Sequence, residues 1–250
     1  MTFKRHIPNL ITLLNLLSGT IAVFFAVKEQ LVLAGLFVFL GIFFDFFDGL
    51  TARLLNVQGE LGKQLDSLAD VVTSGVVPGI ILFQLITNSL IKNGWSSGSK
   101  FVTEFITKDY FNSTFFISII GLFFTLAAAY RLAKFNIDER QTSSFIGLPT
   151  PAATLIVISL PFILEYSASG LAHNLIGNTW FLILLTLLLT YFMNAEIPLF
   201  SLKFKNLIWK DNKIKFIFLG LTVLSTVIFK FLAIPIVIVL YVLLSLVSKK

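Results

Sequence analysis

The segment GIFFDFFDGLTARLLNVQGELGKQLDSLAD (residues 41–70) decides how this chain folds, because it places four aspartates in and beside long apolar runs. Asp45 and Asp48 lie inside one hydrophobic segment, and Asp66 and Asp70 begin the next. An aspartate at the centre of a membrane helix costs about 2.5–3.5 kcal/mol. We therefore expect the four carboxylates to face the interior of a helical bundle, where water or cations compensate their charge.

The composition of the whole chain agrees with a membrane environment. Its 250 residues are 56% hydrophobic and only 13% charged, with a mean hydropathy of +0.91. A typical soluble domain is about 25% charged. These values exclude a disordered chain and most water-soluble folds, and the absence of cysteine excludes a disulfide scaffold.

Eight apolar runs come close to the roughly 20 residues that a transmembrane helix needs. They cover residues 9–27, 31–55, 65–91, 114–136, 147–166, 177–196, 214–230 and 232–248. The sequence thus predicts an all-α, polytopic transmembrane bundle of about eight spans. The last two runs are separated by Lys230 and its neighbours, which is typical of a tight helical hairpin.

The distribution of basic residues predicts the orientation. If both termini are cytoplasmic, most of the 19 Lys and Arg residues fall on the cytoplasmic side. Lys28, Lys92, Lys100, Lys108 and Lys230 are left on the other side, in agreement with the positive-inside rule. Topology and contact with anionic lipid account for most of the net charge of +6. No nucleic-acid partner is expected.

The spacing of the aspartates predicts one shared site. Asp45 and Asp48 are three residues apart and Asp66 and Asp70 are four apart, so each pair lies on one face of its helix. A short polar turn, residues 56–62, joins the two helices, which should be antiparallel neighbours. The four carboxylates are therefore expected to converge, at the cytoplasmic end of the bundle.

Four converging carboxylates need a counter-charge. The chain has no cysteine, and its two histidines are distant in sequence, so an all-oxygen ligand set is expected. Such ligands favour Mg²⁺, Mn²⁺ or Ca²⁺. Two ions would neutralise four carboxylates, and two ions about 3.5–4 Å apart form the arrangement that assists phosphoryl transfer.

Small and basic residues beside the aspartates suit a phosphate ligand. Gly49, Ala52 and Gly62 leave room for a bulky pyrophosphate, and Arg53 offers a guanidinium for its oxygens. Each of these residues also has a plain structural interpretation. Small residues are routine where transmembrane helices pack, and Arg53 is equally a topology signal or a partner of Glu60.

Together these residues form the signature of a known family. Asp45-x2-Asp48-Gly49-x2-Ala52-Arg53-x8-Gly62-x3-Asp66-x3-Asp70 resembles that of the CDP-alcohol phosphotransferases at every fixed position. The resemblance implies a membrane enzyme that transfers the phosphatidyl group of a CDP-linked lipid to an alcohol and releases CMP. It implies that Asp45, Asp48 and Asp66 bind two divalent cations, Mg²⁺ or Mn²⁺, and that Asp70 binds metal and serves as general base. Gly49, Ala52, Arg53, Gly62 and Asp66 would contact the CDP phosphates.

The family also suggests an organisation for the chain. Its core has six transmembrane helices and usually forms a homodimer. Residues 1–200 would form this core, and residues 201–250 would add a C-terminal transmembrane hairpin.

Three further stretches resemble the phosphatidylserine synthase branch of the family, and they imply CDP-diacylglycerol and L-serine as substrates. They are residues 7–19, 131–136 and 147–153. Asn15, Arg131 and Lys134 are the predicted acceptor contacts. The branch commonly has a second arginine at the position of Lys134, so the role of this lysine is open. The start of the third stretch also suits a simple helix N-terminus, with proline at an early position.

Two other functions stay open at this point. A related enzyme would use glycerol 3-phosphate, inositol phosphate or choline as acceptor, and Arg131, Lys134 and Arg140 do not exclude a phosphorylated alcohol. A cation transporter would also contain intramembrane carboxylates. The transporter predicts carboxylates spread along a path through the membrane, whereas here they form a single cluster.

Overall fold

The computed structural model describes residues 2–91, 113–138, 145–199 and 209–247. Residues 92–112, which follow the third apolar run, lie outside these ranges, as does Arg140. The helices are α1 (Thr2–Val27), α2 (Leu31–Leu54), α3 (Glu60–Asp70), α4 (Val77–Ile91), α6 (Ser113–Ser118), α7 (Phe123–Ile137), α8 (Thr150–Tyr166), α9 (Gly170–Ile176), α10 (Thr179–Asn194), α11 (Trp209–Phe229) and α12 (Ala233–Val247).

Short irregular helices join several of these elements into longer passes. The π-helix η1 (Val71–Val76) connects α3 to α4, and the 3₁₀ helix η2 (Ile119–Leu122) connects α6 to α7. A second 3₁₀ turn, η4 (Lys230–Leu232), connects α11 to α12. With these junctions, each of the eight predicted apolar runs coincides with one helix or one chain of contiguous helices.

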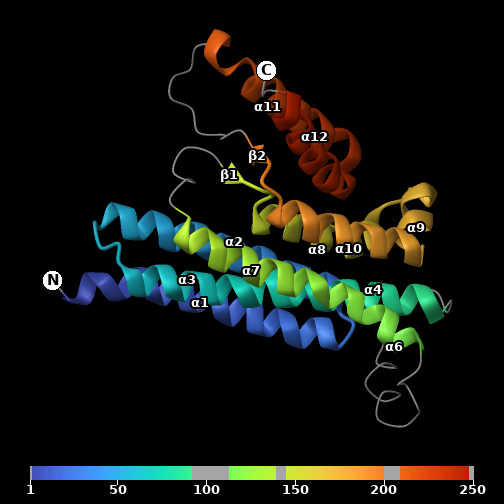
Figure 1. Cartoon of the computed structure of the whole chain (residues 1–250), viewed down its shortest axis with the longest axis horizontal. Coiled ribbons are helices and arrows are strands. Elements are labelled where there is room, and N and C mark those ends of the chain that lie inside the picture. Colours follow the sequence, from blue (N-terminus) through green and yellow to red (C-terminus); the bar gives the residue numbers. More distant parts are fainter. Residues whose placement is uncertain (1, 92–112, 139–144, 200–208, 248–250) are drawn as a thin grey trace.

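The helices form the predicted polytopic bundle, whose passes run back and forth beside one another (Figure 1). Five helical stretches of the described residues are long and apolar enough to cross a membrane, and the bent pair α9–α10 makes a sixth if counted as one span. The 17-residue helix α8 is apolar but shorter. The exterior is apolar as well: Phe46 is 61% exposed and Leu126 is 67% exposed. A surface of this kind suits lipid rather than water.

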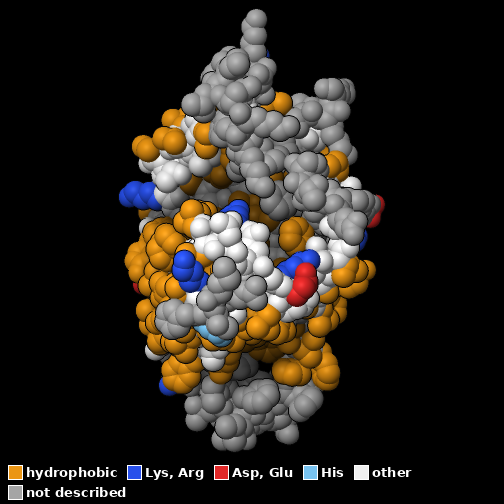
Figure 2. Space-filling model, turned by 90° about the vertical axis from the view of Figure 1, so that its left-hand side faces the viewer, with side chains coloured by type: hydrophobic (Ala, Val, Ile, Leu, Met, Phe, Trp, Pro, Cys, Tyr) orange, Lys and Arg blue, Asp and Glu red, His pale blue; other side chains and the backbone are white. Residues whose placement is uncertain are grey.

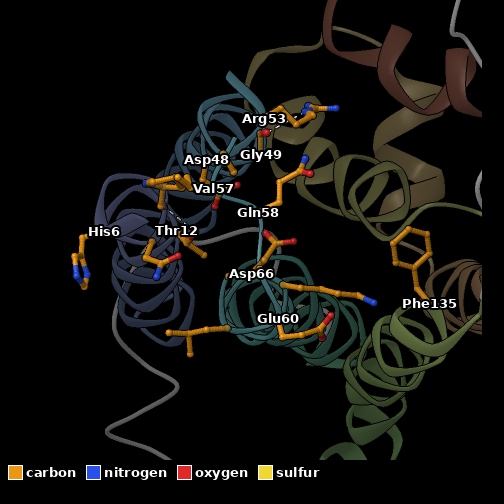
Figure 3. Close-up of a pocket in the computed structure, with 17 residues that line it drawn as sticks. His6, Thr12, Asp48, Gly49, Arg53, Val57, Gln58, Glu60, Asp66 and Phe135 are labelled. Atoms are coloured by element: carbon orange, nitrogen blue, oxygen red, sulfur yellow. Dashed lines mark hydrogen bonds between the residues drawn. The ribbon is translucent and has the colours of Figure 1, made fainter. Parts of the chain in front are cut away.

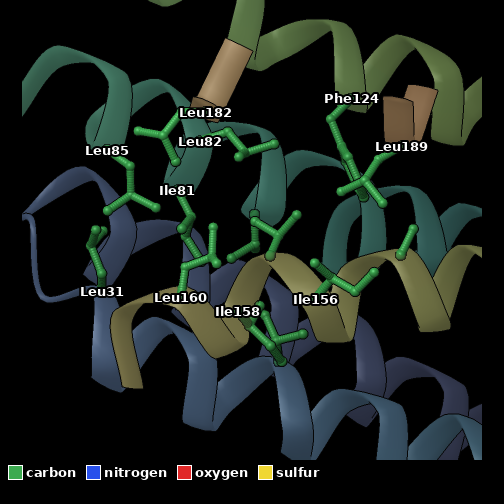
Figure 4. Close-up of a cluster of buried hydrophobic side chains, with 14 of the residues drawn as sticks. Leu31, Ile81, Leu82, Leu85, Phe124, Ile156, Ile158, Leu160, Leu182 and Leu189 are labelled. Atoms are coloured by element: carbon green, nitrogen blue, oxygen red, sulfur yellow. The ribbon is translucent and has the colours of Figure 1, made fainter. Parts of the chain in front are cut away.

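The core lies where α4, α7, α8 and α10 meet (Figure 4). Ile81 and Leu82 of α4, Phe124 of α7, Ile158 of α8 and Leu182 of α10 are fully buried there. α4 is apolar on nearly all sides, and it is the most enclosed of the passes. This central position fixes the direction of α3, which leads into α4 and carries Asp66 and Asp70.

The C-terminal helices fold back on each other. Lys230 adopts a positive φ of 51°, which reverses the chain between α11 and α12. The rings of Phe218 and Tyr241 then lie 5.7 Å apart, although 23 positions separate them in sequence. Phe231 stacks on Phe162 of α8 at 5.2 Å and so attaches the pair to the bundle. The division into a core of residues 1–200 and a hairpin of residues 201–250 stays a prediction.

The sequence did not predict the one pair of strands that the described residues contain. Strand β1 (Phe145–Ile146) pairs antiparallel with β2 (Pro198–Leu199). Gly147 follows with φ of +74°, and a Cβ atom there would lie 2.6 Å from the Met193 carbonyl oxygen. α8 begins three residues later with proline in its first turn, as expected for a helix start.

Candidate functional site

The site lies at one end of the bundle, where α2 ends and α3 begins. The turn between these helices uses Asn56 with a positive φ of 51° and Gly59 in an extended conformation. Arg53 occupies the last turn of α2 and Glu60 the first turn of α3, the ends at which a cation and an anion are stabilised by the helix dipole. The reversal sets Asp48 on α2 opposite Asp66 on α3, as Figure 3 shows.

Three of the four predicted aspartates form a compact cluster. Carboxylate oxygens of Asp45, Asp48 and Asp66 all lie within 4.8 Å of one another. Asp48 is 5% exposed, and its Oδ2 atom is buried without a hydrogen-bond partner, as is Oδ1 of Asp66. Among the residues that the structure describes, no basic side chain forms an ion pair with the cluster. Buried, unpartnered carboxylate oxygens fit a hard divalent cation, so these residues suit the expected metal.

Asp70 is one helical turn deeper and is not one of the three clustered ligands. It is 9% exposed, and its Oδ1 atom accepts a hydrogen bond from the Asn15 amide of α1 at 3.3 Å. Its charge still interacts electrostatically with Asp66 and Asp48. The structure thus brings together three of the four predicted carboxylates, whereas direct contact between Asp70 and metal stays a prediction.

A cavity of about 870 Å³ opens over the cluster. Small-molecule sites typically occupy about 300–1,000 Å³. The predicted site residues that line it are Asp48, Gly49, Ala52, Arg53, Gly62 and Asp66. Figure 2 shows this end of the molecule, where basic and acidic side chains lie around a patch of polar and backbone atoms within a belt of hydrophobic side chains. The carboxylates of Asp48 and Asp66 thus share the cavity lining with the basic side chains of Arg53 and Lys63.

The packing of the protein does not require a glycine at position 49. A Cβ atom added there would meet only Nη2 of Arg53, at 3.9 Å. By contrast, a Cβ atom added at Gly121 would lie 2.5 Å from the backbone nitrogen of Phe83. Gly49 thus keeps space open in the cavity, and this agrees with the phosphate contact predicted for it. Arg53 bends back, and its Nε atom donates to the Gly49 carbonyl oxygen at 3.0 Å.

The predicted acceptor residues do not line this cavity. Arg131 of α7 is 7% exposed; its Nη1 atom donates to Thr150 of α8 at 3.3 Å, and its Nε atom is buried without a hydrogen-bond partner. Lys134, one turn further along α7, forms an ion pair with Glu196 at 3.6 Å. Arg131 and Lys134 therefore have different partners, although both are predicted acceptor contacts.

Several residues around the site were missed by sequence reasoning. His6, Asn9 and Thr12 of α1, Gln58 of the turn, and Phe135 of α7 line the cavity. Asn9, Thr12 and Phe135 lie in the stretches 7–19 and 131–136 that resemble the family, but nothing in those stretches assigns them to the cavity, which only the assembled helices reveal. Thr73 was also missed, although it lies only three residues beyond Asp70.

Comparison with known proteins places these observations in a family. The CDP-alcohol phosphatidyltransferase profile matches residues 5–192, which include α1–α8 and most of α10. The chain belongs to the CDP-alcohol phosphatidyltransferase family. This confirms the resemblance inferred from the signature, and it identifies the protein as an integral-membrane phosphotransferase.

Curated members of the family are similar to the chain over about 70% of its length. The CDP-diacylglycerol–serine O-phosphatidyltransferase of Bacillus subtilis is 31% identical over 183 residues, which cover 71% of this chain and 90% of that protein. The Helicobacter pylori strain J99 enzyme of the same name is 32% identical over 69% of this chain, but the match covers only 62% of that protein. The archaetidylserine synthase of Methanothermobacter thermautotrophicus is 26% identical over 68% of this chain and 64% of that protein.

The carboxylate cluster predicts metal-dependent stability. Mg²⁺ or Mn²⁺ at about 100 times its dissociation constant should stabilise the folded protein by about 2.7 kcal/mol and raise the melting temperature by about 5–10 °C. Asp66→Asn should abolish this increase, because it removes one ligand and one charge. Without metal, its melting temperature should equal or exceed that of the wild type, since a repulsion is removed. Thermal unfolding in detergent, with and without EDTA, measures both effects.

A carboxylate outside the cluster provides the matched control. Glu165 is exposed at the C-terminal end of α8, so Glu165→Gln should keep the full metal-induced increase. An equal increase in wild type and Asp66→Asn would show that metal does not bind at the cluster.

Proposed function

We propose that this chain is a phosphatidylserine synthase, which transfers the phosphatidyl group of CDP-diacylglycerol to L-serine and releases CMP. The observation that carries the choice of acceptor is the similarity, over about 70% of the chain, to enzymes named for serine. Serine appears in the names of bacterial and archaeal relatives whose lipids are named differently, CDP-diacylglycerol and archaetidyl. Serine is thus the shared part of these activities, and the diacyl nature of the lipid rests on the bacterial relatives.

The carboxylates and the cavity provide the donor site in this proposal. Asp45, Asp48, Asp66 and Asp70 would hold two Mg²⁺ or Mn²⁺ ions. When bound, such ions neutralise phosphate charge and polarise the phosphorus–oxygen bonds. Gly49, Ala52 and Gly62 would leave room for the pyrophosphate, and Arg53 would contact its oxygens. The hydrophobic exterior beside the cavity would keep the acyl chains in the bilayer.

Asp70 would act as the general base. Its carboxylate would take the proton from the serine hydroxyl as the serine oxygen attacks the phosphorus that bears diacylglycerol. A new phosphorus–oxygen bond to serine then forms, the bond to the CMP oxygen breaks, and CMP leaves with the electron pair. Burial of Asp70 supports this role, because water competes poorly for a base that is only 9% exposed.

Arg131 would recognise the carboxylate of serine. Its guanidinium is buried, and its Nε atom lacks a hydrogen-bond partner, so an anionic ligand would satisfy both its charge and this free N–H group. Lys134 is already paired with Glu196, which makes it a weaker candidate for the same contact. We also propose the family arrangement: a homodimer with both termini and the site on the cytoplasmic side.

An acceptor panel tests the activity itself. Purified protein with CDP-diacylglycerol and Mn²⁺ or Mg²⁺ should release CMP and form phosphatidylserine when serine is added. Glycerol 3-phosphate, inositol phosphate and choline should give no metal-dependent release. Turnover with one of these instead would keep the family and overturn serine as acceptor. Absence of CMP release with every alcohol, from folded and metal-loaded protein, would favour cation transport.

Asp70→Asn tests the general base. The variant keeps the shape of the side chain but cannot accept the proton, so turnover should fall by at least about 100-fold, the lower end of a general-base contribution. CMP formation is measured with saturating CDP-diacylglycerol and serine, and the melting temperature confirms folding. Near-normal turnover in the folded variant would show that Asp70 is not the base.

Arg131→Lys tests the serine contact, because lysine keeps the charge and loses the planar fork. Loss of a charge-assisted hydrogen bond costs about 1.5–3 kcal/mol, so the KM for serine should rise roughly 10- to 150-fold. The KM for CDP-diacylglycerol serves as the internal control and should stay unchanged. An unchanged KM for serine would remove Arg131 from the acceptor site.

A further inference from the structure

A buried hydrogen-bond chain links Thr73 to Asp70 through Asn15. The Thr73 hydroxyl donates to Oδ1 of Asn15 at 2.8 Å, and Nδ2 of Asn15 donates to Oδ1 of Asp70 at 3.3 Å. Asn15 is fully buried and Thr73 is 1% exposed. Both ends of the Asn15 amide are therefore in use within the protein, in a place that water does not reach.

We propose that Thr73 and Asn15 are positioning residues for Asp70. They fix its carboxylate in the orientation that takes the proton from the hydroxyl of the acceptor alcohol. This inference rests on the proposed function for the role of Asp70. It also gives Asn15 a different role from the acceptor contact predicted from the sequence, because the amide is fully buried and already bonded to Thr73 and Asp70.

The direction of the hydrogen bonds explains why a threonine is needed. An asparagine amide can present either its oxygen or its NH₂ group to a neighbour. Its oxygen would repel the Asp70 carboxylate, whereas its NH₂ group stabilises it. The Thr73 hydroxyl donates to the amide oxygen and so holds the NH₂ group toward Asp70. Oδ1 of Asp70 is then occupied, and its second oxygen is left to take the proton.

The backbone around Thr73 is shaped to admit this side chain. A Cβ atom added at Gly19 of α1 would lie 2.3 Å from Oγ1 of Thr73, and one at Gly41 of α2 would lie 2.6 Å from its Cγ2 atom. The Gly41 Cβ atom would also come within 2.9 Å of Oδ1 of Asn15. Two glycines on two helices thus make room for one threonine and the amide that it holds.

The π-helix η1, which contains Thr73, also determines where this side chain points. It begins directly after Asp70. π-Helical turns are rare and occur often at functional sites, because the extra residue in the turn redirects the side chains that follow. Here the irregular turn lies between the metal-facing carboxylates of α3 and the core helix α4. The chain can therefore point Thr73 toward α1 while α4 stays packed.

The test compares two substitutions of the same threonine. Thr73→Val keeps the shape and removes the hydroxyl, and Thr73→Ser keeps the hydroxyl. Loss of a residue that orients a catalytic ligand typically lowers activity about 10- to 100-fold. We expect this loss in the kcat of Thr73→Val, with an unchanged KM for CDP-diacylglycerol, and we expect Thr73→Ser to restore most of it. The kcat of Asp70→Asn serves as the reference for loss of the general base.

Thr87→Val is the matched control on the same pass. Thr87 is also buried; its hydroxyl donates to the Phe83 carbonyl oxygen and lies 2.8 Å from the Ser118 hydroxyl, far from Asp70. This variant should keep kcat. Full kcat in Thr73→Val would overturn the proposal. So would equal losses of kcat and melting temperature in Thr73→Val and Thr87→Val, because such losses would reflect stability alone.

A second measurement does not depend on turnover. Protein labelled with ¹⁵N at asparagine should show the Asn15 side-chain amide as a slowly exchanging NMR signal, assigned by its absence in Asn15→Asp. In Thr73→Val this signal should shift and exchange faster, and an unchanged signal would overturn the proposal. If the wild type uses an alcohol other than serine, the kinetic comparison is made with that alcohol. In that case the proposal that serine is the acceptor fails, but the kinetic comparison still tests whether Thr73 and Asn15 position Asp70.

Discussion

The arrangement of this protein depends on the cost of placing carboxylates inside an apolar helical bundle. Three carboxylates whose oxygens lie within 4.8 Å of one another repel, and two of their oxygens are buried without a hydrogen-bond partner. Such a cluster is stable only beside cations or water. This requirement explains its place at the end of the bundle, where α2 gives way to α3 and a cavity reaches the surface. The apolar exterior can then face lipid without interruption.

The same region shows two different uses of small residues. Gly49 faces the cavity, and an added Cβ atom would find open space. Gly19 and Gly41 face Thr73, and an added Cβ atom at either position would overlap it. The first glycine leaves open space in the cavity, whereas the other two allow helices to approach closely. The sequence alone does not distinguish these two uses, because the residue is glycine in each case.

The basic residues of α7 also separate into two roles once they are placed in space. Arg131 points into the bundle toward Thr150, and Lys134 pairs with Glu196 near the surface. The Nε atom of Arg131 is buried without a hydrogen-bond partner, whereas the Lys134 side chain is partly exposed and already paired with a carboxylate.

The sequence by itself determined the membrane bundle, its apolar passes and the convergence of three of the four aspartates. These features follow from local quantities: hydropathy over about 20 residues, the helical period, and the length of the turn between α2 and α3. The family signature is equally local, because it depends on fixed gaps within residues 45–70. The tertiary structure alone decided that Asp70 bonds to Asn15, that Thr73 holds this amide, and that Arg131 and Lys134 have different partners. Those contacts join helices 19 to 62 residues apart in sequence, and they depend on how closely the helices approach, which no local pattern encodes.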